Sequence, residues 1–332
     1  MILSLFQRPL APIAVACVLS LLASHTDCAA QVGGVYPPAP DGYKLIEGDI
    51  IVPVAQSGPH GTKGVYRPYY PFYWPDGVVP YEFDAAVAPT NRIVVLDALA
   101  EWEAVASVHF VPRNGQGDYL CFQNSTENSS MVGKMGGRQV VNIFNWWKFI
   151  IVHELGHALG LWHEQSRPDR NSYIQINLAN IEPGLEDNFQ VYSEARYYAP
   201  YDFDSIMHYN ACAFSVCASC DTNTPTCWTI VVQPPYAAQW QNRIGQRDHL
   251  SHWDQTIMSF LYPQPDWVFV QKDFPGTLGG SFLFPFADFA TGETNVPSGG
   301  TLWVLTPGIY TATGTHSKPM TIQAPLGGVV LQ

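Results

Sequence analysis

The segment that decides the fold is HELGHALGLWHEQ, residues 153–165. It places His153, His157 and His163 four and then six residues apart, and Glu154 directly follows the first of them. Residues i and i+4 lie on one face of a helix, so the imidazoles of His153 and His157 point toward a common position. Three neutral imidazoles that leave a fourth position open are typical of a catalytic zinc site rather than a structural one. The alternative, histidines in the core of a helix without a metal, does not explain this spacing.

The rest of the segment suits metal-assisted hydrolysis. Gly160 ends the expected helix and permits the change of direction that brings His163 back toward the other imidazoles. Zinc lowers the pKa of a bound water and polarises a carbonyl group. Glu154 is close enough to act as general base without being a ligand. We therefore expect one catalytic zinc ion, with Glu154 as a catalytic residue.

Hydrophobic periodicity around this segment predicts a mixture of strands and helices. The expected strands are residues 77–83, 108–113 and 136–144, and the expected helices are 89–107, 146–160 and 250–263. Thr90 and Asn145 are candidate N-caps of the first two helices. Residues 113–131 are expected to form a polar loop, and residues 161–204 are expected to be long loops with short helices.

The chain changes character after the last expected helix. Pro263 and Pro265 indicate a domain boundary. The remaining residues, 264–332, read as short strands separated by Gly and Pro, and they resemble one or two coils of a right-handed parallel β-helix. Because one coil cannot bury its own apolar face, either this β-rich segment packs on the preceding domain or the chain is short of a complete β-helix.

The first 73 residues are expected to be absent from the working protein. Residues 1–30 have the form of a secretory signal peptide, with Arg8 near the start, an apolar stretch and small residues at the end. Residues 31–73 form a leader rich in Pro, Gly and Tyr, with one apolar island, KLIEGDIIVP (44–53). We therefore expect a secreted, extracellular protein, and no other segment is suited to span a membrane.

The composition excludes some classes of partner. The formal net charge is −12, and charged residues make up only 13% of the chain. An acidic chain with few lysines does not suit nucleic acid or an anionic membrane surface, so we expect neither as a partner.

The cysteines fall into two groups once the signal segment is set aside. One group is crowded into a single loop: Cys212, Cys217, Cys220 and Cys227. Export favours two local disulfides among these four, and their connectivity does not follow from the sequence. A four-cysteine zinc site is the alternative, because Cys217 and Cys220 have the spacing of a zinc knuckle. Cys121 stands alone and is expected to be a free, buried thiol.

Two motifs resemble those of a known family. HELGHALGLWHEQSRPDR (153–170) looks like the zinc signature of the astacin family within the metzincin clan, and YDFDSIMHY (201–209) resembles its Met-turn. The resemblance covers residues 74–263. It implies an α+β zinc peptidase domain of two lobes, an upper lobe with a twisted sheet and two long helices and an irregular lower lobe. The small all-β segment then follows this domain.

The resemblance also implies roles for single residues near the metal. Tyr209 resembles the tyrosine that stabilises the oxyanion of the transition state. Met207 resembles the residue that forms an apolar floor under the three histidines, and His208 is expected to be structural because the ligand set is already complete. Glu164 resembles the glutamate that anchors the mature N-terminus through a buried polar network, and the alternative is a surface carboxylate.

The leader island resembles the pro-segment motif of the same family. In that motif an aspartate after a glycine takes the place of the catalytic water on zinc, and the corresponding residues here are Asp49 and Gly48. The uncleaved chain is then expected to be inactive until cleavage between Pro53 and Trp74. The alternative is that Asp49 is an exposed carboxylate in a turn.

The resemblance implies where a substrate lies but not which substrate is preferred. GGRQVV (136–141) resembles the edge strand along which substrate lies antiparallel. The usual disulfides of the family cannot form, because only Cys121 precedes the zinc helix apart from the signal segment. The family's substrate preference is therefore not carried over.

Three interpretations follow. The leading one is a secreted, monomeric zinc endopeptidase that acts on protein or peptide substrates. The alternative is a non-catalytic zinc-containing binding protein that uses the β-rich segment, but such relatives usually lack the glutamate base, which is present here as Glu154. A structural β-helix protein is the third, and the β-rich segment is short for that role.

Overall fold

The computed structural model describes residues 40, 42–54, 72–191 and 197–332 of the chain. The expected signal segment, residues 1–30, lies outside the described residues, and so does most of the leader apart from the apolar island. Among the described residues, no helix is long and apolar enough to cross a membrane.

A seven-stranded mixed sheet forms the base of the first lobe, in the order β1-β2-β6-β7-β5-β3-β4. Its strands are β1 (Tyr43–Ile46), β2 (Ile50–Pro53), β3 (Val78–Phe83), β4 (His109–Pro112), β5 (Tyr119–Asn124), β6 (Ser129–Met131) and β7 (Arg138–Ile143). Strands β7, β5, β3 and β4 are parallel, whereas β6 pairs antiparallel with β7. The leader contributes β1 and β2 as an antiparallel hairpin, and β2 pairs parallel with β6.

Two expectations about this sheet are wrong. Residues 113–131 do not form one polar loop, because they contain β5 and β6. The first four residues of β5 are all buried, and a strand buried on both faces lacks the alternation of polar and apolar residues that identifies a strand. Residues 136–141 do not form an edge, because β7 lies between β5 and β6. The strand that the leader covers is β6.

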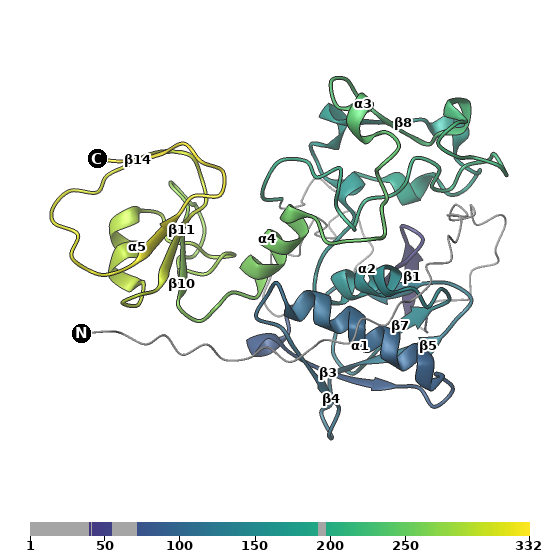
Figure 1. Ribbon diagram of the computed structural model, residues 1–332, viewed down its shortest axis with the longest axis horizontal. Coiled ribbons are helices and arrows are strands. Elements are labelled where there is room, and N and C mark those ends of the chain that lie inside the picture. The colour runs from purple at the N-terminus through teal and green to yellow at the C-terminus, as the bar shows by residue number, and fades with distance from the viewer. Residues whose placement is uncertain (1–39, 41, 55–71, 192–196) are drawn as a thin grey trace, which may run out of the picture.

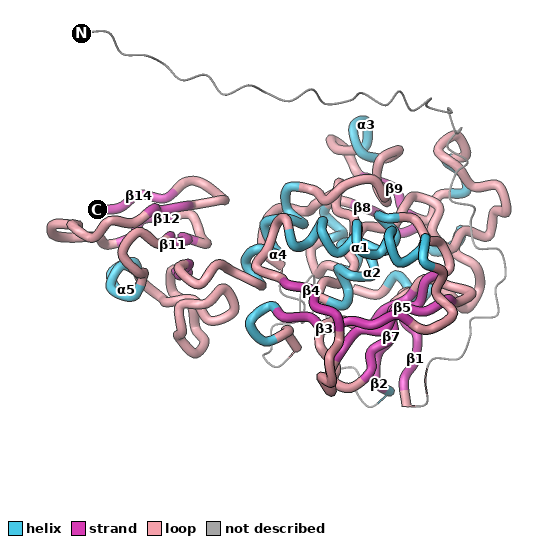
Figure 2. Tube along the Cα trace, turned by 60° about the horizontal axis from the view of Figure 1, so that its bottom comes forward, coloured by secondary structure: helices cyan, strands magenta, loops and turns pink. Residues whose placement is uncertain are grey.

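Two helices, α1 (Pro89–Glu103) and α2 (Lys148–Ala158), cover one face of the sheet, and the second lobe lies on the other side of them (Figures 1 and 2). Trp102 of α1 is fully buried, and its indole N–H donates to the carbonyl of Val152 in α2 over 2.9 Å. This bond joins the two helices beside the segment that carries the histidines.

The caps of these helices differ from the expectation. The N-cap positions are Ala88 and Trp147, and neither side chain makes a capping hydrogen bond, so Thr90 and Asn145 are not the caps. In α1, Pro89 occupies the first turn. An N–H group there would have no acceptor within the helix, so the N–H that proline lacks costs no hydrogen bond.

The second lobe, residues 161–251, is mostly irregular, as expected. Its short elements are η3 (Glu164–Ser166), η4 (Arg170–Ser172), β8 (Ile174–Ile176), η5 (Leu178–Asn180), η6 (Glu186–Phe189), η7 (Pro225–Cys227), β9 (Ile230–Val232) and α3 (Ala237–Trp240). Helix α4 (His252–Leu261) follows, and it begins with a capping box formed by Ser251 and Asp254. The Asp254 carboxylate also accepts from the backbone N–H of Ile206 over 2.8 Å, which ties α4 to the predicted Met-turn.

The C-terminal segment lies beyond α4, on the side away from α2 (Figure 1). Its elements are β10 (Trp267–Val270), α5 (Phe289–Asn295), β11 (Thr301–Val304), β12 (Gly308–Tyr310), β13 (Thr321–Gln323) and β14 (Val329–Leu331). Strands β10, β11 and β13 form one parallel sheet, and β12 and β14 form another. Phe260 of α4 packs against Trp303, Phe269 and Phe282, with ring centroids 4.8–5.3 Å apart.

Candidate metal centre

Helix α2 carries two of the predicted metal ligands, and the turn after it positions the third. His153 and His157 are one helical turn apart, and both are buried. Gly160 follows the helix with a φ of +114°, a conformation that side chains rarely adopt, and an added Cβ would lie 3.0 Å from the ring of Tyr73. This reversal brings His163 back, and its ring centroid lies 4.7 Å from that of His157.

Four side chains converge in a group that could hold a metal ion. One ligand atom from each of Asp49, His153, His157 and His163 lies within 4.8 Å of the others. The Oδ2 atom of Asp49 is 3.2 Å from Nε2 of His153 and 3.2 Å from Nε2 of His163, and its Oδ1 is 3.8 Å from Nε2 of His157. Asp49 comes from the leader, so the site combines residues about a hundred positions apart.

Hydrogen bonds at the other ring nitrogen orient each imidazole. The Nδ1–H of His153 donates to the carbonyl of Ile206, and the Nδ1–H of His157 donates to the carbonyl of Leu161, both over 2.8 Å. A backbone carbonyl only accepts, so these two bonds leave Nε2 of each ring as the free lone pair. The second lobe and the turn after α2 therefore set the direction in which both nitrogens point.

The donor set fits a zinc ion. Nε2 of His157 and Oδ1 of Asp49 are buried, and neither has a hydrogen-bond partner among the described residues. Buried polar atoms without partners are uncommon and call for a ligand. Imidazole nitrogens and a carboxylate oxygen are among the ligands that zinc takes in proteins, and four of them match its usual number of ligands. His153, His157, His163 and Asp49 would hold the ion in the uncleaved chain.

The charges of the site are strongly coupled. Burial raises the pKa of Asp49, but the three imidazoles, His163 first, outweigh burial and hold this pKa well below its usual range. Burial lowers the pKa of His163, and the charges and hydrogen bonds of Asp49 and Glu47 raise it to about 9. Burial, followed by the charge of Asp49, raises the pKa of Glu154 well above its usual value. Glu154 is 1% exposed, and its Oε2 has no partner among the described residues.

The predicted Met-turn lies against the histidines. The ring of Tyr209 is 4.5 Å from the ring of His163, centroid to centroid, and its hydroxyl donates to the backbone carbonyl of Glu47. Met207 is buried against α2, where a Cβ added to Gly156 would meet its sulfur at 2.7 Å. His208 belongs to a different network and is not in the metal group.

His208 and Glu164 are held by the second lobe. The Nδ1–H of His208 donates to the carbonyl of Tyr209 over 2.6 Å, so its Nε2 accepts from the hydroxyl of Tyr201 over 2.8 Å. Glu164 is 3% exposed, so it is not a surface carboxylate. Its Oε1 accepts from Arg167 and from the backbone N–H of Asp202, each over 2.8 Å.

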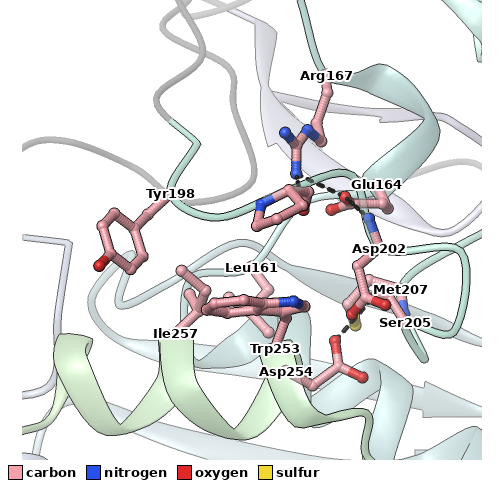
Figure 3. A pocket seen from close by; sticks show the side chains of 11 residues that line it. Leu161, Glu164, Arg167, Tyr198, Asp202, Ser205, Met207, Trp253, Asp254 and Ile257 are labelled. Atoms are coloured by element: carbon pink, nitrogen blue, oxygen red, sulfur yellow. Dashed lines mark hydrogen bonds and ion pairs between the residues drawn. The ribbon is translucent and has the colours of Figure 1, made fainter. Parts of the chain in front are cut away.

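A small cavity lies beside Glu164 (Figure 3). Its volume is about 20 Å³, which is enough for about one water molecule. Carboxylates of Glu164, Asp202 and Asp254 line it, and Arg167 is the cation that lines it. Burial, followed by the charges of Asp254 and Glu164, raises the pKa of Asp202 to about 8.

The cysteine loop forms two disulfides, Cys212–Cys220 and Cys217–Cys227. The four-cysteine zinc alternative is therefore wrong, because all four sulfurs are paired. Cys121 is free and buried in β5, as expected.

The sequence did not identify two residues that contact the metal group or the leader. Oε2 of Glu47 is 2.7 Å from Nδ1 of His163, and this carboxylate is buried. Phe214 of the cysteine loop contacts the leader so closely that a Cβ on Gly48 would lie 2.4 Å from its Cζ. A carboxylate two positions before Asp49 was a signal for the first, whereas no sequence pattern indicated the second.

Comparisons with known proteins agree with this geometry. The model of the astacin peptidase family matches residues 69–263. The astacin-like metalloendopeptidase of Mus musculus is 35% identical over 245 residues, which cover 70% of this chain and 51% of that protein. High choriolytic enzyme 1 of Oryzias latipes, a hatching enzyme zinc-protease, has a solved structure with 33% identity and a TM-score of 0.51, covering 56% of this chain and 88% of that chain.

The mixed α+β fold and the group of three histidines are those of a class of peptidases with a metal-binding site. The chain belongs to the astacin family of peptidases. It spans about half the length of the mouse relative and 27% of the bone morphogenetic protein 1 of Xenopus laevis, which is 38% identical over 199 residues.

Proposed function

We propose that this chain is the latent precursor of a secreted zinc-dependent endopeptidase that acts on protein or peptide substrates. The observation that carries the proposal is the position of Asp49, whose carboxylate faces the Nε2 atoms of all three histidines. A carboxylate is a good zinc ligand, so Asp49 would occupy the position that a catalytic water needs. The leader would then keep the site inactive until it is removed.

The leader also contacts residues of the site other than the metal group. Glu47 binds His163 through its side chain and accepts from the hydroxyl of Tyr209 through its backbone carbonyl. A hydroxyl that donates to the leader is not available to a developing oxyanion. Removal of the leader would therefore free Tyr209 as well as the fourth metal position.

Catalysis would use residues that the leader now covers. A zinc ion bound by the three histidines would polarise the scissile carbonyl and lower the pKa of a water. Glu154 would accept the proton of that water and pass it to the leaving amine, as its burial beside the site allows. Tyr209 would donate a hydrogen bond to the oxyanion. Met207 would support the histidines from the second lobe.

Glu164 would act after cleavage. The network of Glu164, Asp202 and Asp254 contains more carboxylates than cations, and the cavity beside it has room for a small group (Figure 3). A new N-terminal amine, formed by cleavage between Pro53 and Trp74, would be attracted to these carboxylates. We expect Glu164 to anchor it.

Secretion is supported by two features. The first thirty residues have the pattern of a signal peptide, and two disulfides are typical of an oxidising compartment. The division of the chain into signal, pro-segment, catalytic domain and β-rich C-terminal segment also stays a proposal. The parallel pairing of β10, β11 and β13 supports the resemblance of the last part to a β-helix.

The test uses the Glu154→Ala variant, which is produced as the full chain and then freed of its leader by limited proteolysis. This variant should bind one equivalent of zinc, because all three histidines remain, and should lose nearly all peptidase activity. A chelator should abolish the activity of the wild-type protein. Near wild-type cleavage by the variant would contradict the role of Glu154, and chelator-insensitive cleavage would contradict the metal mechanism. If the activated wild-type protein binds zinc and cleaves no peptide, the alternative of a non-catalytic binding protein is correct.

A further inference from the structure

Glu127 lies in the turn between β5 and β6, next to the path that the leader takes to the metal group. Three residues later, the N–H of Ser130 donates to the backbone carbonyl of Asp49 over 2.8 Å. Three extended residues span at most about 10 Å, so Glu127 is close to Asp49. The residue therefore lies beyond the end of β6 that is next to Asp49.

The carboxylate of Glu127 is buried without a partner. The residue is 5% exposed, and its Oε2 makes no hydrogen bond among the described residues. A buried carboxylate that lacks a partner is costly, and such a group is normally paired with a cation or a hydrogen-bond donor. The ionisable group that acts on it, Asp49, has a charge of the same sign. Burial, followed by the charge of Asp49, raises the pKa of Glu127 to about 7.

Removal of the leader changes the charges around Glu127. Asp49 and strand β2 leave together, and the edge of β6 becomes free to pair with another extended chain. A substrate strand bound to β6 would pass Glu127 as it approaches the histidines. The substrate side chain at this point would meet the carboxylate of Glu127, whose Oε2 has no hydrogen-bond partner among the described residues.

We propose that Glu127 is a specificity residue that binds a basic side chain of the substrate, Lys or Arg, next to the scissile bond. A cationic side chain supplies both the hydrogen-bond donors and the charge that the buried carboxylate lacks. An acidic substrate side chain would be rejected at the same position. This inference rests on the proposed endopeptidase function and adds its substrate class.

The experiment compares matched peptides on the activated full chain loaded with zinc. The peptides of each set are identical except at one position, which is Lys, norleucine or Glu. In successive sets this variable position is placed at each residue on either side of the scissile bond. The readout is the ratio of kcat/KM for the Lys peptide to kcat/KM for the norleucine peptide. The variants are Glu127→Gln, which removes the charge and keeps the shape, and Asp97→Asn, a matched control on the exposed face of α1.

We expect the wild-type ratio to exceed about ten at one position and Glu127→Gln to lower it about tenfold or more, because a hydrogen bond between charged groups is replaced by a weaker one. Asp97→Asn should leave the ratio unchanged, and Glu127→Lys should favour the Glu peptide. Zinc content and thermal unfolding of each variant show whether it is folded.

Other outcomes overturn the inference without touching the proposed function. If the wild-type protein cleaves Lys and norleucine peptides equally at every position, Glu127 does not select the substrate. If Glu127→Gln slows both peptides by the same factor, the residue has a structural role. If the wild-type protein cleaves none of the peptides, the endopeptidase function itself is contradicted.

Discussion

The contact between Gly48 and Phe214 predicts that Gly48→Ala activates the uncleaved precursor. Gly48 has a φ of +75°, and an added Cβ would lie 2.4 Å from Cζ of Phe214. Phe214 itself has a φ of +55° and lies in the loop closed by two disulfides. The ring also packs against the rings of Tyr209 and Phe189, with centroids 5.6 and 6.0 Å apart, so the leader is the partner expected to shift.

The magnitude follows from two costs. A left-handed backbone costs an alanine roughly 1–2 kcal/mol, and crowding of a packed site costs roughly 1–3 kcal/mol. Together they weaken the closed leader by about 2–4 kcal/mol, taking the lower part of the crowding range. At about 1.4 kcal/mol per tenfold change, the open fraction of the precursor rises roughly 30- to 1,000-fold.

The assay measures peptidase activity of the zinc-loaded precursor, and mass spectrometry shows that the chain is still intact. Gly42→Ala is a matched control in the same leader, because Gly42 has a φ of +85° and nothing within 4 Å of an added Cβ. Gly42→Ala carries the cost of the left-handed backbone without the crowding, and Gly42 lies away from the metal group. Adding Phe214→Ala to Gly48→Ala should remove the crowding and lower the activity again. An intact Gly48→Ala precursor that is no more active than the wild-type precursor, or equal activation by Gly42→Ala, would show that crowding by Phe214 does not open the leader.

Three further predictions concern the same site and the cysteines. Asp49→Ala in the intact precursor should raise basal peptidase activity, because the proposed fourth ligand is lost; a variant as silent as the wild-type precursor would mean that latency comes from steric blocking alone. Tyr209→Phe in the activated protein should lower kcat about a hundredfold with little change in KM, as for the loss of one oxyanion donor, and an unchanged kcat in steady-state assays removes Tyr209 from the catalytic set. Thiol counting on denatured, unreduced protein should find one free group, Cys121, once the signal segment has been removed; a count of five would contradict both disulfides.

Local patterns in the sequence were enough to predict the group of three histidines and the main helices. The positions of His153 and His157 follow from the period of a helix, and Gly160 indicated the turn that returns His163. The three histidines lie within eleven positions of one another, so the local course of the chain brings them together. The motif resemblance then indicated the α+β fold of two lobes, which the family match and the fold of the solved relative confirm.

Only the tertiary structure decided the order of the sheet and the surroundings of the metal group. Strand β5 escaped detection because burial on both faces removes the polar alternation of a strand. The packing of strands that are distant in the sequence also decides that β7 is an internal strand and that β6 is the strand that the leader covers. Residues 47 and 163 are separated by 116 positions, yet their side chains are 2.7 Å apart. Periodicity and motif spacing describe residues within a few helical turns of one another. The contacts among the leader, the cysteine loop and the β5–β6 turn depend instead on how separate elements pack.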